Sequence, residues 1–132
     1  MTLRCLIVDD SHWFLCAARH LLESQGIAVV GMASNSAEAL RGAAELQPDV
    51  TLVDIDLGGE DGLAVARRLA EADGGQAGKV ILISTHDEVE FADLIEASPA
   101  IGFIAKGALE ASAIRRLVDA TRTLGRTRGS AE

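Results

Sequence analysis

Acidic and hydroxyl side chains occur where short apolar runs of the sequence end. Asp9 and Asp10 directly follow the first run, and Asp54 follows the third. Ser84 and Thr85 follow the fourth. Each run has the length and composition of a buried strand. Because the carboxyl ends of parallel strands meet at one edge of a sheet, we expect these side chains to lie close together.

This grouping of charges points to metal and phosphate chemistry. Carboxylates at one edge repel one another, and burial adds a desolvation cost. A divalent cation offsets both effects, and Mg²⁺ binds through one or two carboxylates together with a phosphate group. Lys106 directly follows the fifth apolar run, where a flexible cation can neutralise a phosphoryl group. The sequence therefore predicts a Mg²⁺-assisted phosphoryl site at this edge.

The apolar runs alternate with helical patterns along the chain. The runs span residues 3–8, 27–32, 50–53, 80–83 and 101–105, mostly without internal alternation, which is typical of strands covered on both faces. Apolar positions recur at helical spacing between them, most clearly in 109–121 and least in the acidic segment 87–97. This order predicts an α/β fold, a doubly wound five-stranded parallel sheet with helices on both faces.

Local signals place the ends of several elements. Asn35 followed by Glu38 predicts an N-cap with a capping box, and Gly26 predicts the end of the first helix. We expect one domain of ordinary size over residues 1–124. The Gly-, Ser-, Arg- and Thr-rich residues 125–132 are expected to form a flexible tail.

Composition excludes several classes of partner. The 132 residues are 48% apolar, which is enough for one well-buried core. A net charge of −8 argues against direct contact with nucleic acid or an anionic membrane. No leader or run of ~20 apolar residues is evident, so we expect a cytoplasmic protein. For Cys5 and Cys16, two buried thiols are favoured over a disulfide or metal pair.

The motifs resemble those of the receiver domain of bacterial two-component response regulators, over roughly residues 3–124. The matching stretches are LIVDD at 6–10, PDVTLVDIDL at 48–57, DGL at 61–63, VILIST at 80–85 and GFIAKG at 102–107. The resemblance implies a flavodoxin-like fold with strand order 2-1-3-4-5. It also implies a switch that a sensor histidine kinase or phosphotransfer protein phosphorylates, and that controls an output partner through helix 4, strand 5 and helix 5.

The resemblance assigns the acidic residues distinct roles. Asp54 matches the phosphoacceptor, whose carboxylate forms a labile acyl phosphate. Asp10 matches a direct metal ligand, and Asp9 an acidic group that acts largely through water. Asp56 matches the position whose backbone carbonyl completes the Mg²⁺ site. The protein would catalyse only its own phosphorylation and dephosphorylation.

Four further residues match the parts that read the phosphoryl group. Lys106 matches the lysine that pairs with phosphate, and Ser84 and Thr85 are assigned to phosphate binding. Ser84 and Phe103 match the switch pair, in which the hydroxyl moves inward and makes space for the aromatic ring. The added charge then biases a two-state surface.

The sequence departs from the family pattern at two loops. Gly107 follows Lys106 where the family usually has proline, so this bond is either trans with a shifted loop or a strained cis bond. Gly58, four residues after Asp54, occupies a position where proline is common in the family, and Gly59 follows it, so we expect a more flexible loop there.

Residues around the site have plainer interpretations. His12 and His20 are expected to be solvated helix positions. Trp13 is interpreted as a packing residue, with a reporter of phosphorylation as the alternative. The acidic run of the fourth helix is interpreted as a solvated face, with a partner site as the competing interpretation; its members are Asp87, Glu88, Glu90, Asp93 and Glu96.

Two other classes of function compete with the receiver interpretation. The stretch TLVDIDLGG also resembles the first motif of haloacid dehalogenase-type phosphohydrolases, but in those enzymes the motif is on the first strand and the paired acids come late. Alternatively, the chain is the receiver fragment of a DNA-binding transcriptional regulator, although we favour a stand-alone receiver. The oligomeric state, including a homodimer, stays open.

Overall fold

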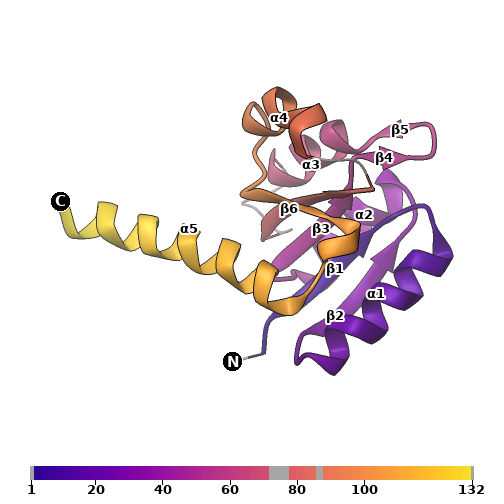
Figure 1. Cartoon of the computed structure of the whole chain (residues 1–132), viewed down its shortest axis with the longest axis horizontal. Helices are drawn as coiled ribbons and strands as arrows, with labels where there is room; N and C mark the ends of the chain where they lie inside the picture. The colour runs from indigo at the N-terminus through magenta and orange to yellow at the C-terminus, as the bar shows by residue number, and fades with distance from the viewer. Residues whose placement is uncertain (1, 72–77, 86–87, 132) are drawn as a thin grey trace.

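The computed structural model describes residues 2–71, 78–85 and 88–131, and the side chains outside 88–91 and 122–131 (Figure 1). Its main sheet has five parallel strands in the order β2-β1-β3-β6-β7. The strands are β1 (Arg4–Val8), β2 (Ala28–Ala33), β3 (Val50–Asp54), β6 (Lys79–Ser84) and β7 (Gly102–Ala105). Counting these strands alone, the order is 2-1-3-4-5, and the predicted topology is confirmed.

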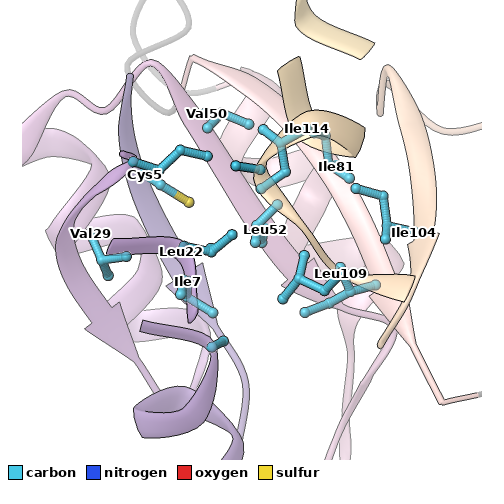
Figure 2. Close-up of a cluster of buried hydrophobic side chains, with 14 of the residues drawn as sticks. Cys5, Ile7, Leu22, Val29, Val50, Leu52, Ile81, Ile104, Leu109 and Ile114 are labelled. Carbon is cyan, nitrogen blue, oxygen red and sulfur yellow. The ribbon is translucent and has the colours of Figure 1, made fainter. Parts of the chain in front are cut away.

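Helices cover both faces of this sheet. They are α1 (His12–Ser24), α2 (Ser36–Leu46), α3 (Gly62–Glu71), α4 (Glu88–Glu96) and α5 (Ala111–Ala131), with a short 3₁₀ turn η1 (Lys106–Ala108) before α5. The buried residues of α1 and α5 share one core cluster, part of which Figure 2 shows. Those of α2, α3 and α4 share the other. Cys5 and Ile7 of β1 face the first cluster and Leu6 and Val8 the second, which explains why the strand shows no polar alternation.

Local capping defines the ends of α1 and α2. Gly26 has φ +91°, and Ile27 N donates to Leu22 O at 3.0 Å, so α1 ends in a Schellman-type cap as the glycine predicts. Asn35 Oδ1 accepts from Glu38 N at 2.9 Å, which confirms the N-cap. The Glu38 carboxylate accepts from Ser34 N at 2.7 Å rather than from the N-cap residue itself. The second hydrogen bond of the predicted capping box therefore comes from Ser34 N, one residue before the N-cap.

A short antiparallel hairpin follows β3 and has no counterpart in the sequence analysis. It pairs β4 (Asp56–Leu57) with β5 (Glu60–Asp61). Gly58 and Gly59 form the two-residue turn with φ +54° and +104°, the positive values that tight hairpins require. The Glu60 carboxylate accepts from Ser36 N at 3.0 Å and from Ser36 Oγ at 2.5 Å, which ties the hairpin to the start of α2. Greater flexibility of this loop stays a prediction.

The C-terminal helix extends further than composition indicates. α5 continues to Ala131, so the backbone of residues 125–131 is helical and projects away from the sheet (Figure 1). The domain boundary after residue 124 and the flexibility of the tail stay predictions. Among the described residues, no helix has the length and apolar content that a bilayer crossing requires.

We predict that Gly62→Ala destabilises the fold by about 1–3 kcal/mol. A Cβ at Gly62 would overlap the carbonyl oxygen of Asp54, so the end of β3 would have to shift. Urea unfolding measures the change. Gly42→Ala, in the interior of α2, is the matched control, because its Cβ would make ordinary contacts with the Leu6 side chain of β1. It should be neutral or stabilising by up to about 1 kcal/mol. Equal stability of the two variants would refute this close approach.

Candidate functional site

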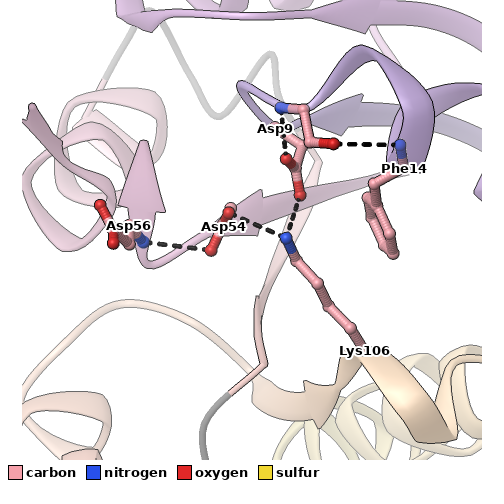
Figure 3. A network of polar contacts seen from close by, with 6 residues as sticks. Asp9, Phe14, Asp54, Asp56 and Lys106 are labelled. Atoms are coloured by element: carbon pink, nitrogen blue, oxygen red, sulfur yellow. Dashed lines mark hydrogen bonds and ion pairs between the residues drawn. The ribbon is translucent and has the colours of Figure 1, made fainter. Parts of the chain in front are cut away.

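The carboxyl ends of three strands bring opposite charges into contact. Asp9 follows β1, Asp54 ends β3, and Lys106 follows β7. Lys106 Nζ lies 2.6 Å from Asp9 Oδ2 and 3.0 Å from Asp54 Oδ2, and thus bridges the two carboxylates (Figure 3). Asp9, Asp10 and Asp54 each offer an oxygen, and these oxygens lie within 4.8 Å of one another. The predicted convergence of the strand ends is therefore present.

Burial distinguishes the three carboxylates. Asp9 is fully buried and Asp54 is 5% exposed, while Asp10 is exposed at the rim. Asp9 Oδ1 accepts from Ser11 N at 2.8 Å. Asp9 Oδ2 makes no regular hydrogen bond among the described residues, so its charge is compensated by the Lys106 ammonium. An acidic group of this kind is costly unless it is paired.

The charges of the site shift the pKa of two of its members. Burial raises the pKa of Asp54 above the ordinary 3.8, and the Asp9 charge adds to this. The Lys106 hydrogen bond and Asp56 N, which donates to Asp54 Oδ1 at 3.1 Å, oppose the rise. Burial alone would lower the pKa of Lys106, but its ion pair with Asp9 and its hydrogen bond to Asp54 raise it overall. Lys106 therefore stays charged at neutral pH.

The backbone around Lys106 settles the question raised by Gly107. The structure contains no cis peptide bond among the residues it describes, so the Lys106–Gly107 bond is trans. Lys106 begins η1, and Leu109 N donates to Lys106 O at 3.3 Å. The ammonium lies 4.4 Å from the centroid of the Phe14 ring, within the range of a cation–π contact. Phe14 of α1 therefore supports the lysine from a third element.

Gly58 has a structural role in the site that the sequence analysis missed. A Cβ at this position would lie 2.5 Å from Asp10 Oδ2, and φ is +54°. Glycine therefore adopts this φ without strain and lets the hairpin turn pack against the Asp10 carboxylate without displacing it. The Gly58-Gly59 pair was the available signal, since such dipeptides are typical of tight hairpins.

The remaining predicted residues lie at the same end of the sheet, with different exposure. Ser84 is buried at the end of β6, and Thr85 is exposed. Phe103 is half-buried in β7 and packs against the cluster beneath α2, α3 and α4. The Asp56 side chain is exposed, which leaves its backbone as the part of the residue near Asp54. Their assigned roles stay predictions.

Two expectations about α1 are wrong. Trp13 is 79% exposed, so it is not a packing residue; it lines a groove of about 370 Å³ together with Thr85 and Lys106. Cys16 is exposed, whereas Cys5 is buried as expected, and burial raises the pKa of the Cys5 thiol to about 12. Both errors have one cause. Trp13 and Cys16 lie beside, not within, the stripe of α1 that faces the core.

Several residues that were expected to be solvated are exposed, wherever the structure describes their side chains. His12 and His20 are exposed, as expected of solvated helix positions. Asp93 and Glu96 of the acidic run are exposed as well. The other three members of the run, Asp87, Glu88 and Glu90, have side chains outside the described residues.

Comparison with known proteins agrees with this geometry. The family model of the response regulator receiver domain matches residues 5–119. Two solved structures are similar in sequence and fold. A LuxR-family two-component response regulator from Aurantimonas sp. SI85-9A1 has a TM-score of 0.81 at 29% identity, over 91% of this chain and 87% of that one. The receiver domain of the putative response regulator NarL from Mycobacterium tuberculosis has a TM-score of 0.76 at 29% identity, over 92% of this chain and 97% of that one.

Curated relatives are longer than this chain. Protein-glutamate methylesterase/protein-glutamine glutaminase 5 from Myxococcus xanthus is 37% identical over 109 residues, 82% of this chain and 29% of the relative. A putative transcriptional regulator from Pseudomonas aeruginosa is 36% identical over 103 residues, 78% of this chain and 49% of the relative. The chain thus spans about half or less of the length of these two relatives.

We predict that Asp54→Asn stabilises the metal-free protein at neutral pH by on the order of 1 kcal/mol, the scale of one buried polar group. The raised pKa of Asp54 means that the folded state binds more protons than the unfolded state above pH 3.8. Stability therefore falls as pH rises from 3.8 through the raised value, and the asparagine removes that loss. Urea unfolding in the presence of a chelator measures this difference in stability. The advantage of Asp54→Asn over the wild type should shrink as the pH is lowered toward 3.8.

Asp56→Asn is the control for this comparison, because the Asp56 carboxylate is exposed and should contribute little to the free energy of unfolding. A net loss of stability in Asp54→Asn at neutral pH would show that pairing with Lys106 outweighs the burial of Asp54.

Proposed function

Because the chain belongs to the response regulator receiver domain family, we propose that it is a phosphorylation switch in which Asp54 accepts a phosphoryl group from a sensor histidine kinase or phosphotransfer protein. The observation that carries the proposal is the bridge from Lys106 to Asp9 and Asp54 beside a group of three carboxylates. A nucleophile, a place for a cation and a lysine lie within one pocket. That is the set of parts that phosphoryl transfer requires.

We infer that the cation is Mg²⁺. The donor atoms available at the rim are carboxylate oxygens, which suit a hard divalent ion. Asp10, Asp54 and the backbone carbonyl of Asp56 would hold the ion, with Asp9 acting through water. When bound, Mg²⁺ supplies charge neutralisation for the phosphoryl oxygens. The pairing of Asp9 with Lys106 supports its indirect role, because that carboxylate already has a cationic partner.

The residues of the chain position the reacting carboxylate. Asp56 N holds Asp54 Oδ1, and Lys106 holds Asp54 Oδ2. An oxygen of Asp54 forms the new bond to phosphorus as the bond from phosphorus to the donor breaks, and an acyl phosphate results. Lys106 can then turn from Asp54 to the phosphoryl oxygens while it keeps Asp9 as a partner. The raised pKa of Lys106 supports this role, since the lysine remains a cation throughout.

The output of the switch follows from the added charge. A phosphoryl group brings nearly two negative charges and three acceptor oxygens. Ser84 and Thr85 lie at the end of β6 and would bind these oxygens, while Phe103 of β7 would change its packing in response. We propose that α4, β7 and α5 form the surface that reports the change to an output protein. A homodimer and a cytoplasmic location stay predictions.

A second candidate function has the same phosphorylation chemistry but places the receiver within a longer regulatory protein. The similar LuxR-family regulator and the Pseudomonas aeruginosa relative support a receiver that belongs to a DNA-binding transcriptional regulator. The net charge of −8 argues that DNA contact would not come from these 132 residues. The haloacid dehalogenase alternative has no such support, because the paired acids follow β1 and Asp54 ends β3.

We predict a Mg²⁺-dependent covalent adduct on incubation with acetyl phosphate, visible by intact-mass spectrometry as one added phosphoryl group. Asp54→Asn should lose at least ~100-fold in adduct yield, because the amide is not a nucleophile. Asp56→Asn is the matched control: it keeps the backbone carbonyl and should still form the adduct. An adduct on Asp54→Asn, or equal yields with chelator and with Mg²⁺, would refute the proposal.

A further inference from the structure

One exposed face of α1 carries side chains that bind borderline metal ions. His12, Cys16 and His20 follow one another at intervals of four residues, so they lie along the same side of the helix. All three are exposed. His12 Nε2 lies 3.7 Å from Cys16 Sγ, so the imidazole and the thiol already face each other.

We propose that His12 and Cys16 form a two-ligand site for Zn²⁺, separate from the carboxylate site of the phosphorylation pocket. Zinc binds sulfur at about 2.3 Å and imidazole nitrogen at about 2.0–2.1 Å, so a tetrahedral angle places these two atoms about 3.5 Å apart. The observed separation of 3.7 Å is close to this value. The pair is therefore spaced for chelation with little movement of either side chain.

The helix holds this pair in place. Ser11 caps α1, since its Oγ accepts from Phe14 N at 3.2 Å. Leu15, Ala18 and Leu22 bury an adjacent stripe of the helix in the core. Both ligands thus project from one rigid element, and less conformational freedom is lost when an ion binds.

Ligand chemistry separates this site from the carboxylate group. Thiolate and imidazole favour zinc, whereas carboxylate oxygens favour Mg²⁺. Binding requires the thiolate, so the Cys16 proton leaves to solvent as the Zn–S bond forms. Two protein ligands leave the other zinc positions to water, which makes the site open.

His20 provides an internal control for the assignment. It has the same spacing from Cys16 as His12, but of these two histidines it is His12 whose ring nitrogen lies 3.7 Å from the sulfur among the described residues. His12 and His20 cannot chelate one ion together, because eight residues of helix separate them by about 12 Å. The assigned pair is therefore His12 with Cys16.

The test is a titration with Co²⁺, a spectroscopic probe for zinc sites, with Mg²⁺ in excess so that the carboxylate site is occupied. The wild-type protein should develop a thiolate-to-cobalt charge-transfer band that saturates at one ion per chain and disappears when Zn²⁺ is added. Cys16→Ser should lose the band, and His12→Gln should bind at least about tenfold more weakly. His20→Gln and Cys5→Ala should behave as wild type.

Absence of the band in the wild type overturns the proposal, as does equal binding by His12→Gln. So does a band that depends on His20 in place of His12. Alkylation of the folded wild-type protein is the second measurement, because it needs no substitution. Zn²⁺ should slow the modification of Cys16, identified by peptide mass, at least about tenfold. If the 3.7 Å contact were only a weak hydrogen bond, Zn²⁺ would leave this rate unchanged.

Discussion

The two ion pairs of Lys106, with Asp9 at 2.6 Å and Asp54 at 3.0 Å, connect the ends of three strands. Three carboxylates share this pocket with one ammonium group, so negative charge is in excess. Such an imbalance costs folding free energy unless a cation offsets it. The fold tolerates it because β1, β3 and β7 are fixed by two apolar clusters on opposite faces of the sheet. The favourable free energy of core packing therefore compensates for unfavourable charge repulsion at the edge of the sheet.

That imbalance also suits the pocket to its proposed chemistry. Asp54 is nearly buried, which raises its pKa, yet Lys106 and Asp56 N hold its two oxygens in fixed positions. A carboxylate that is oriented but incompletely compensated is stabilised further by each positive charge that arrives. Functional residues commonly reduce stability in this way. Gly58 contributes by having no side chain where the hairpin approaches the Asp10 carboxylate, and Gly62 does the same where α3 approaches the backbone carbonyl of Asp54.

The sequence predicted the sheet and the pocket well, because both depend on simple periodicity. Apolar runs without alternation marked strands buried on two faces, and the strand ends located Asp9, Asp54 and Lys106. The Gly58-Gly59 pair signals a tight turn, but the β4–β5 hairpin was missed because the Glu60–Ser36 contact that fixes it joins residues 24 positions apart. Trp13 and Cys16 were misplaced for another reason. Both side chains are apolar enough for a core, and only packing decides which face of α1 is buried.

We propose that the pocket carries excess negative charge that one Mg²⁺ offsets, with Lys106 as a competing cation. Calorimetric titration with Mg²⁺ measures this competition on the wild-type protein and on Lys106→Met and Asp10→Asn. We expect one ion per chain for the wild type, tighter Mg²⁺ binding by Lys106→Met and weaker Mg²⁺ binding by Asp10→Asn. Weaker binding by Lys106→Met than by the wild type, or no binding by the wild type, would contradict it.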